Sequence, residues 1–472
     1  MQDKKKELAR NTVILTIGKI CTQFISFMLL PLYTALLEPK EFGIVDLLNT
    51  YISLLVPIFN WQFDSGLFRF MIENRNREDN QKKIFSTVII SNVFQAIIYL
   101  AFYFIVQGYI GSKYKIFLAI NVVLSIFLST LLQLPRALGD NISYSIASFV
   151  SATSAVLLNV IFIAGMKLGA YGMFYATVLS NIITIIYITI ALKTWKYFSI
   201  SSFDRKVLKN ISKYSVPLIP NQLSWWVVSA SDRSIVSYFI GVMANGIYSV
   251  ANKFSSVYIT FYNIFNLSWT ESVTINFKEE DREIFITEMM NMMFNIFASV
   301  DLGIIACMPF VFPVMINSQY QEAYNQIPIL MLAVLFQVIV GLYSVIYVAL
   351  KKSVEIAKTS IYAAIINILV NVCMIKLIGL YAAAISTLLA YLLMAIYRYI
   401  DVKKYINIPL KTNNMIITLL MAILVVGSYY LKNNKVSFVI LIITVLYAYI
   451  MNRGIIDSVL KLIKNKIINI KK

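Results

Sequence analysis

Apolar runs of roughly 20 residues, the length that crosses the hydrocarbon core of a bilayer, follow one another along almost the whole chain. The connections between them are too short to fold as soluble domains. We therefore predict an all-α polytopic membrane protein of about 14 transmembrane helices. The predicted spans cover residues 12–37, 43–68, 84–106, 114–135, 143–166, 170–192, 213–240, 245–270, 286–316, 327–350, 358–378, 380–400, 413–431 and 435–452.

Composition supports a membrane protein and excludes several kinds of site. Of 472 residues, 59% are hydrophobic and 14% are charged, whereas soluble proteins carry roughly 25% charged residues. Histidine is absent, which removes the commonest metal ligand and general base. Cys21, Cys307 and Cys373 are too far apart for a zinc motif or a disulfide framework. We expect no cofactor, no metal-ligand cluster and no catalytic residues, so the chain is predicted not to be an enzyme.

The net charge of +18 follows the membrane topology. Three of the 41 Lys and Arg residues, namely Lys19, Arg233 and Lys253, lie deep within predicted spans, and those within two residues of a span end are counted with the adjoining loop. The amino terminus and every second loop hold most of the others. The remaining loops hold only Lys40, Lys113, Lys115, Lys167, Lys376, Lys432 and Lys435. This positive-inside pattern predicts two cytoplasmic termini and an even number of spans, and it leaves no need for a nucleic-acid partner.

Short matches between the two halves indicate an internal repeat. Lys167-Leu168-Gly169-Ala170-Tyr171 resembles Lys376-Leu377-Ile378-Gly379-Leu380-Tyr381 with one insertion, and Phe42-Gly43-Ile44 resembles Asn245-Gly246-Ile247. Chance matches between apolar segments are the alternative. Parallel repeats of six helices would frame a central cavity. We predict two pseudo-symmetric six-helix lobes, over residues 1–195 and, after a basic cytoplasmic linker, 196–404, followed by two accessory helices and a basic tail over 405–472.

Polar residues recur at helical spacing in four of the spans, which are equivalent pairs under the repeat. We therefore predict a polar cavity between the lobes. The alternative is that these side chains only join helices, at about 0.6 kcal/mol each. The residues are Thr12, Thr16, Lys19, Gln23 and Ser26; Asn49, Ser53, Asn60 and Asp64; Asn221, Gln222, Ser224, Ser229, Ser231, Asp232 and Arg233; and Ser249, Asn252, Ser256 and Asn263.

Charges deep in the spans are candidates for function, because each costs roughly 2.5–3.5 kcal/mol near the bilayer centre. Arg233 is expected about 10 Å from the outer end of its helix. Lys19 has the alternative of snorkelling to the interface. Arg233 and Lys253 have the alternative of structural pairing with acids. Arg69 and Arg136 end their spans on the cytoplasmic side, where topology alone also explains them.

The basic side chains outnumber the acidic ones expected in this cavity, which favours an anionic cargo. Arg and Lys also suit phosphate oxygens. The predicted substrate-binding residues are Lys19, Gln23, Arg69, Arg136, Asn221, Arg233 and Lys253. The candidates for ion coupling are Asp64, Asp232 and Asp301, because desolvation favours the neutral form of a carboxyl.

Prolines and glycines complete the prediction. Pro31, Pro57, Pro217 and Pro220 fall inside spans, where they either serve helices that rock or mark static kinks. Gly43 and Gly246 follow very short outer loops, where we expect a residue without Cβ to allow tight chain reversal.

Several motifs in order resemble the O-antigen and polysaccharide flippases of the Wzx type, within the multidrug/oligosaccharidyl-lipid/polysaccharide exporter superfamily. The resemblance covers residues 11 to about 400. It rests on Gly18-Lys19, Pro31-Leu32-Tyr33-Thr34, Glu41-Phe42-Gly43, Asn159, Gly169-Ala170-Tyr171-Gly172, Ala176-Thr177, Tyr214-Ser215-Val216-Pro217-Leu218-Ile219-Pro220, Ser224-Trp225-Trp226, Ser231-Asp232-Arg233 and Gly246-Ile247-Tyr248-Ser249-Val250-Ala251. Among the charges, the family motifs match at Lys19, Arg69, Arg136, Asp232 and Arg233.

The resemblance implies a V-shaped bundle that moves an undecaprenyl-diphosphate-linked oligosaccharide to the outer leaflet of the bacterial cytoplasmic (inner) membrane. Membrane lipids would surround it, and polysaccharide polymerase or glycosyltransferases would be its protein partners. Two alternatives are weighed against this. A cation-coupled multidrug exporter would favour an acidic, aromatic cavity. A membrane glycosyltransferase would need a sizeable outer loop with paired carboxylates, and the sequence offers none.

Overall fold

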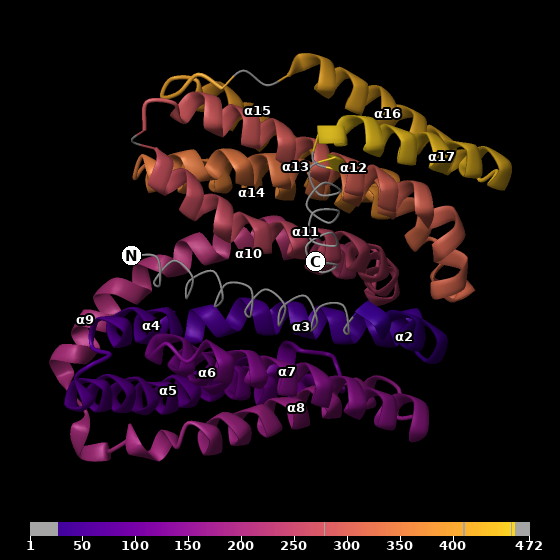
Figure 1. The fold of residues 1–472 in the computed structure, drawn as a ribbon. Coiled ribbons are helices and arrows are strands. Elements are labelled where there is room, and N and C mark those ends of the chain that lie inside the picture. Colours follow the sequence, from indigo (N-terminus) through magenta and orange to yellow (C-terminus); the bar gives the residue numbers. More distant parts are fainter. Residues whose placement is uncertain (1–26, 278, 409–410, 455, 458–472) are drawn as a thin grey trace, which may run out of the picture. The chain divides into compact units, whose positions relative to one another are not determined.

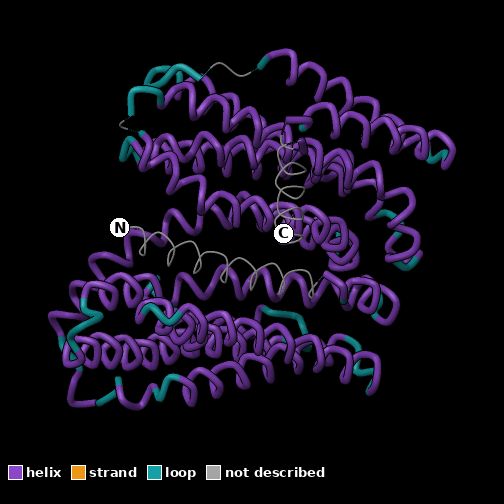
Figure 2. Tube along the Cα trace, in the orientation of Figure 1, coloured by secondary structure: helices purple, strands orange, loops and turns teal. Residues whose placement is uncertain are grey.

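The computed structural model describes residues 27–277, 279–408, 411–454 and 456–457, and this part of the chain is helical without a strand (Figure 2). Eleven of its helices are long and apolar enough to cross a membrane. The all-α fold is therefore confirmed. The count of fourteen spans is not, since most of the first predicted span, 12–37, lies outside the described residues.

The chain forms two compact units, which divide between Ser249 and Val250. In the first unit, α4 to α8 pack against one another and against α3 (Figure 1). Its described helices are α2 (Leu30–Leu36), α3 (Pro39–Phe59), α4 (Phe63–Glu73), α5 (Glu78–Val106), α6 (Lys115–Leu138), α7 (Asn141–Asn159) continued by a π-helical turn (Val160–Gly165), α8 (Ala170–Ala191), α9 (Arg205–Ser215), α10 (Ile219–Phe239) and the start of α11 (Val242–Asn276).

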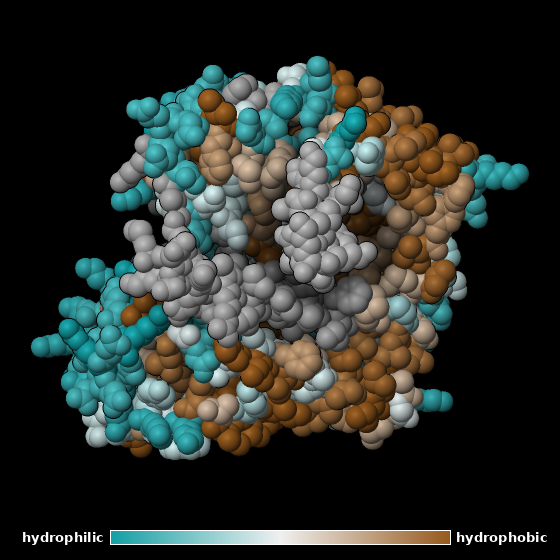
Figure 3. All heavy atoms as spheres, viewed as in Figure 1, coloured by the Kyte–Doolittle hydropathy of each residue, from teal (hydrophilic) through white to brown (hydrophobic). Residues whose placement is uncertain are grey.

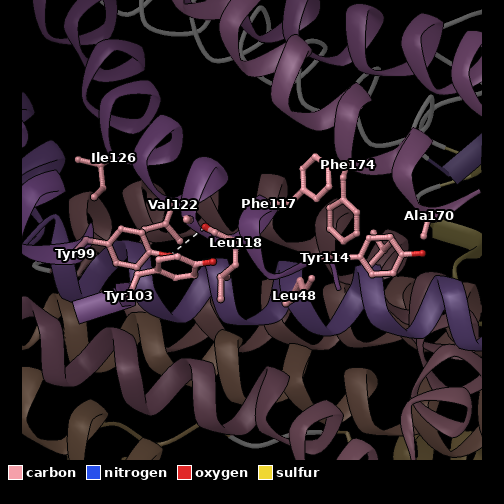
Figure 4. Packing of buried hydrophobic residues seen from close by; sticks show 12 residues of the cluster. Leu48, Tyr99, Tyr103, Tyr114, Phe117, Leu118, Val122, Ile126, Ala170 and Phe174 are labelled. Carbon is pink, nitrogen blue, oxygen red and sulfur yellow. Dashed lines mark hydrogen bonds between the residues drawn. The ribbon is translucent and has the colours of Figure 1, made fainter. Parts of the chain in front are cut away.

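Aromatic residues fill much of the core of the first unit (Figure 4). The rings of Phe117 on α6 and Phe174 on α8 stack with centroids 4.9 Å apart. The Tyr99 hydroxyl on α5 donates to the Leu118 carbonyl oxygen at 3.1 Å, so a buried tyrosine keeps its hydrogen bond, as a site without water requires. This core holds α5, α6 and α8 together beside α3.

The second unit comprises the rest of α11 and the helices α12 to α17. Here α13 and α14 pack on α15, and α12 packs on α16 and α17. The bounds are α12 (Arg282–Met315), α13 (Ala323–Ala349), α14 (Ser353–Ile378), α15 (Leu380–Val402), α16 (Thr412–Leu431) and α17 (Asn434–Met451).

A ladder of polar side chains along α12 holds the last two helices. Asn295 Oδ1 accepts from Asn414 Nδ2 at 3.3 Å, and Ser299 Oγ accepts from Asn452 Nδ2 at 2.9 Å. Asn291 Oδ1 accepts from the Lys411 backbone N–H at 2.8 Å. These positions repeat every four residues and so share one face of α12. Interhelical hydrogen bonds of this kind join helices within a bilayer, and α16 and α17 dock here as a pair.

The surface has the character of a membrane protein. Many large apolar side chains of the described residues are exposed, among them Phe104, Ile105, Leu419 and Ile450. In the first unit, hydrophilic side chains gather at the end where α9 lies, and hydrophobic ones cover much of the flank (Figure 3). That end carries the basic loops that the charge pattern assigns to the cytoplasm.

The division at Ser249 and Val250 falls inside α11, later than the basic linker. In the first unit, α9 packs on α4 and α5, and α10 packs on α3. The boundaries at 195/196 and 404/405 were placed by aligning the two halves of the sequence with each other, and they stay a prediction.

The predicted repeat has a counterpart in the backbone. Gly169 precedes α8 with φ 57° and ψ −137°, and Gly379 precedes α15 with φ 58° and ψ −135°. Only glycine adopts this region readily. Two glycines that the sequence aligned therefore share one rare conformation at the start of equivalent helices.

Two predicted spans are interrupted. The span 43–68 breaks into α3 and α4 at Asn60–Gln62, where Trp61 and Gln62 have φ values of 52° and 56°. Pro57 lacks the N–H that would continue the helical ladder in the last turn of α3. The span 213–240 breaks into α9, a 3₁₀ turn (Val216–Leu218) and α10. Pro217 therefore lies in the turn between two helices, and Pro220 lies in the first turn of α10.

We predict that Gly379→Ala lowers the free energy of unfolding by about 1–3 kcal/mol, because a side chain is strained at this φ although open space surrounds it. The matched control is Gly427→Ala in α16, which also meets open space but has helical geometry. The control should be neutral or stabilising by up to about 1 kcal/mol. Unfolding of the purified protein in detergent measures the change in stability of each variant. Equal changes in the two variants would contradict a strained backbone at residue 379.

Candidate functional site

Charged and polar side chains of α3, α10 and the start of α11 meet in the first unit. Arg233 on α10 lies with Nε 3.0 Å from Oδ2 of Asp46 on α3, and the two side chains are 17% and 15% exposed. This contact is an ion pair rather than an aligned hydrogen bond. The Arg233 Nη1 also donates to the Ser229 carbonyl oxygen at 3.2 Å. The pair neutralises two charges that would be costly apart in a mostly buried place.

A third charge of the site, Asp232, faces α11. Its Oδ2 accepts a hydrogen bond from the buried Tyr248 hydroxyl at 2.5 Å. Ser249, next along α11, donates from Oγ to Asp46 Oδ2 at 2.5 Å. Adjacent helical residues point about 100° apart, so Asp232 and Arg233 reach different partners. Asp46 thus joins α10 and α11 to α3.

Gly43 and Gly246 allow α3 and α11 to approach within backbone contact beside these charges. A Cβ on Gly43 would overlap the Val242 carbonyl oxygen, and a Cβ on Gly246 would overlap the Pro39 carbonyl oxygen. The Asn245 Nδ2 donates to the Gly43 carbonyl oxygen at 3.0 Å. Both glycines lie within helices, and neither has a positive φ. The expected role in chain reversal is wrong, because these glycines serve a close helix crossing.

Trp226 fastens α10 to the middle of α3. Its indole Nε1 lies 3.1 Å from both the Thr50 carbonyl oxygen and the Ser53 hydroxyl oxygen. The Ser53 side chain itself donates to the Thr50 carbonyl oxygen at 2.7 Å. A polar contact of this kind inside a membrane bundle fixes the rotation of α10 about its axis.

Sequence reasoning missed Asp46. The residue lies three positions before Asn49 and seven before Ser53, so it extends the polar stripe of the span 43–68 by one turn. Its acidic side chain inside an apolar run was the available signal. Because Asp46 was omitted, the predicted excess of positive charge around Arg233 was too large.

Arg69 and Arg136 lie apart from this cluster, near the ends of α4 and α6. The Nη2 of Arg69 lies 2.9 Å from Oε1 of Glu73, and the two side chains are 58% and 50% exposed. The Arg136 guanidinium lies over the rings of Phe68 and Tyr144, 4.8 and 5.3 Å from their centroids. Aromatic faces leave such a cation its donors, so Arg136 keeps a capacity to bind an anion.

Asp64 and Gln222 line a pocket of about 420 Å³ at the break between α3 and α4, together with both polar and apolar side chains. Asn221 is exposed on α10. Lys253 follows on α11, partly exposed and in the second unit. Asp301 on α12 is fully buried in that unit, and neither of its oxygens has a hydrogen-bond donor among the described residues. Lys19 and Gln23 lie outside the described residues.

The chemistry of this cluster is reversible binding. An arginine, two carboxylates, a tyrosine and a serine exchange hydrogen bonds and ion pairs. Among the described residues, no group of three or more Cys, Asp or Glu is arranged to hold a metal ion. The guanidinium carries its N–H donors in its plane, along its edges, and its present partner, a carboxylate, is of a kind that another oxyanion can replace.

Comparison with solved structures identifies the fold. The chain is similar to the lipid II flippase MurJ in an inward closed conformation, with a TM-score of 0.70, 14% identity, and coverage of 95% of this chain and 100% of that chain. It is also similar to a multidrug resistance MATE family transporter of the MOP superfamily. The inward-facing form gives a TM-score of 0.65 at 14% identity, covering 82% and 96% of the two chains. The outward-facing form gives 0.59 at 15%, covering 84% and 94%.

Sequence comparison identifies the family. No curated protein matches the chain. The family described as polysaccharide biosynthesis protein matches residues 8–270, more than half of the chain. This segment includes α3, α10 and nearly all of α11, and therefore the whole Asp46–Arg233 cluster. The chain is a multi-pass membrane protein that belongs to the polysaccharide biosynthesis protein family.

Proposed function

We propose that the chain is a flippase that moves an anionic, undecaprenyl-diphosphate-linked oligosaccharide from the inner to the outer leaflet of the cytoplasmic membrane. The protein works without covalent chemistry, by alternating access, in the synthesis of a surface polysaccharide such as O-antigen. Its termini are cytoplasmic, and the enzymes that assemble or polymerise the sugar are its partners. The family and the flippase fold support a lipid-linked substrate.

The observation that carries the proposal is the ion pair of Arg233 and Asp46. A diphosphate offers oxyanions that a guanidinium can bind through paired N–H donors, as it can a carboxylate. In this mechanism, the guanidinium exchanges Asp46 for the diphosphate when cargo binds, which releases α3 from α10. The cargo thereby exerts the differential affinity that a conformational change requires. Lys19, Arg69, Arg136 and Lys253 are the further cationic binding residues, with Gln23 and Asn221 as hydrogen-bonding ones.

An ion gradient would drive the cycle. The three candidate carboxylates for ion coupling, Asp64, Asp232 and Asp301, differ in which ion each could bind and release. Asp232 is engaged with Tyr248. Asp301 is enclosed without a donor, where only a proton could neutralise it at low cost. Asp64 lines a pocket of mixed polar and apolar side chains, and this pocket would admit a hydrated ion.

A cation-coupled multidrug exporter is the second candidate function. The specific observation in its favour is that the described cluster contains two carboxylates, Asp46 and Asp232, and one guanidinium. The likeness to MATE transporters is also compatible with it. The flippase is preferred because the matching family is one of polysaccharide biosynthesis.

Transport in vesicles tests the function directly. Purified protein would be reconstituted with a fluorescent lipid-linked oligosaccharide diphosphate, and a membrane-impermeant quencher would report how fast the lipid changes leaflet. We expect movement well above that in protein-free vesicles, and no uptake of a cationic dye in the same vesicles. Dye uptake without lipid movement would establish the exporter instead.

We predict that Arg233→Gln lowers flipping at least tenfold and Asp46→Asn also impairs it, because the exchange needs both charges. Each change should cost about 1–3 kcal/mol of stability by leaving a mostly buried charge unpaired. The double variant should recover about 0.5–3 kcal/mol of the summed loss while transport stays low. The control pair Arg453→Gln and Asp457→Asn, at an exposed contact of 3.7 Å, should change neither readout. Additive stability losses at 46 and 233 would rule out the pairing.

We predict that cysteines at 46 and 249 form a disulfide on mild oxidation in a variant lacking Cys21, Cys307 and Cys373, because the native side chains touch. A matched control uses cysteines at 46 and 243, since Met243 is exposed on another face of α11. If 46 and 243 link as readily as 46 and 249, the contact between α3 and α11 is not as described.

A further inference from the structure

The break between α3 and α4 creates a helix end inside a predicted membrane span. The helix α3 ends at Phe59, and the left-handed residues Trp61 and Gln62 lead into α4 at Phe63. The final carbonyl groups of a helix lack intrahelical donors and carry partial negative charge. Interrupted membrane helices present such carbonyl ends to cations.

Three buried amide side chains lie at or near this break, and the amide nitrogen of each donates a hydrogen bond. The Asn60 Nδ2 donates to Ser129 Oγ at 3.0 Å, and the Asn92 Nδ2 donates to Thr130 Oγ1 at 2.7 Å. The Gln95 Nε2 donates to the backbone carbonyl oxygen of Asn60 at 3.2 Å. The three side chains come from α5 and from the break itself, and they are at most 1% exposed.

The oxygens of the same amides have no donor in the described part of the chain. They are Asn60 Oδ1, Asn92 Oδ1 and Gln95 Oε1, and Asp64 Oδ1 shares this state. A buried polar atom without a partner costs about 1–3 kcal/mol. Turning an amide over would only leave its N–H groups unpaired instead. The buried side-chain atoms around the break that lack a partner among the described residues are therefore these four acceptors.

The pocket beside the break supplies access but no positive charge. It is lined by Asp64 and by Asn49, Ser53, Ser129 and Gln222 among others, and none of its lining residues is Lys or Arg. Oxygen ligands without nitrogen or sulfur suit hard cations. One carboxylate balances one positive charge, whereas divalent sites that bind strongly combine more carboxylates.

We propose that the break between α3 and α4 binds a monovalent cation, Na⁺, through Asp64, the side-chain oxygens of Asn60 and Gln95, and the carbonyl end of α3. Asn92 lies one turn before Gln95 on α5 and supports the site from that helix. The few ligands suit the coordination shell of Na⁺ better than the larger shell of K⁺. Binding fixes the angle between α3 and α4.

A role for this site in coupling rests on the proposed transport function, although binding itself does not. The helix that ends at the break also carries Asp46. A cation bound at one end of α3 would therefore influence the position of this helix, and with it the polar contacts that α3 makes to α10 and α11.

Thermal unfolding of the purified full chain in detergent tests the site, with NaCl, KCl and choline chloride at equal ionic strength. We expect a saturable rise of several degrees in the unfolding temperature with Na⁺ only, and a change in tryptophan fluorescence, because Trp61 lies in the break. Asp64→Asn and Asn60→Ala should each abolish the Na⁺ effect. Gln95→Leu should abolish it as well, while removing one unpaired oxygen.

The matched control is Asn159→Ala on α7. Asn159 is also buried, uses its Nδ2 on the Ala155 carbonyl oxygen, and has an unpaired Oδ1. It should keep the full Na⁺ response. Equal stabilisation by the three salts, or a Na⁺ response that survives in Asp64→Asn and Asn60→Ala, would overturn the site. A Na⁺ response in a protein that moves no lipid would retain the cation site and refute the flippase.

Discussion

The lack of water in the hydrocarbon core governs this structure, because every polar group there must find its partner within the protein. For the backbone, helices meet this requirement, and the described chain is helical accordingly. For side chains, the requirement is met by contacts between helices. Asp46 accepts from Ser249 and pairs with Arg233, and Asn295 accepts from Asn414. Groups that remain unmet, as around Asn60, are therefore informative about ligands.

The elements were predictable from sequence because their signals are local. Apolar length defines a span wherever it occurs, and the distribution of Lys and Arg defines its orientation. Gly169 and Gly379, which the sequence aligned, likewise stand where glycine adopts the backbone most readily. A residue type dictated by its own φ and ψ needs no knowledge of the rest of the fold.

The partners of the charged residues were not predictable, because they depend on which helices touch. Arg233 was a candidate from its depth, but its pairing with Asp46 joins two helices far apart in sequence. The break at Asn60–Gln62 was also hidden, since an apolar run has the same composition whether it is straight or interrupted. Pro57 and the polar residues after it gave the only sign. Lys19 and Gln23 lie outside the described residues, so their place relative to Arg233 stays a prediction.

The crossing of α3 and α11 combines a close backbone contact with a few polar bonds. Gly43 contacts Val242, which lies four residues before Gly246. Gly246 in turn contacts Pro39, which lies four residues before Gly43, so the contact is reciprocal. Equivalent segments meet in this way at a two-fold axis. The contact is made by backbone at the two glycines, where a Cβ on either one would overlap a carbonyl oxygen of the other helix or its connection. Its specificity then resides in the polar bonds beside it, at Asp46 and Asn245. These are bonds that an oxyanion or water can replace, so a junction of this composition is stable when closed and inexpensive to separate.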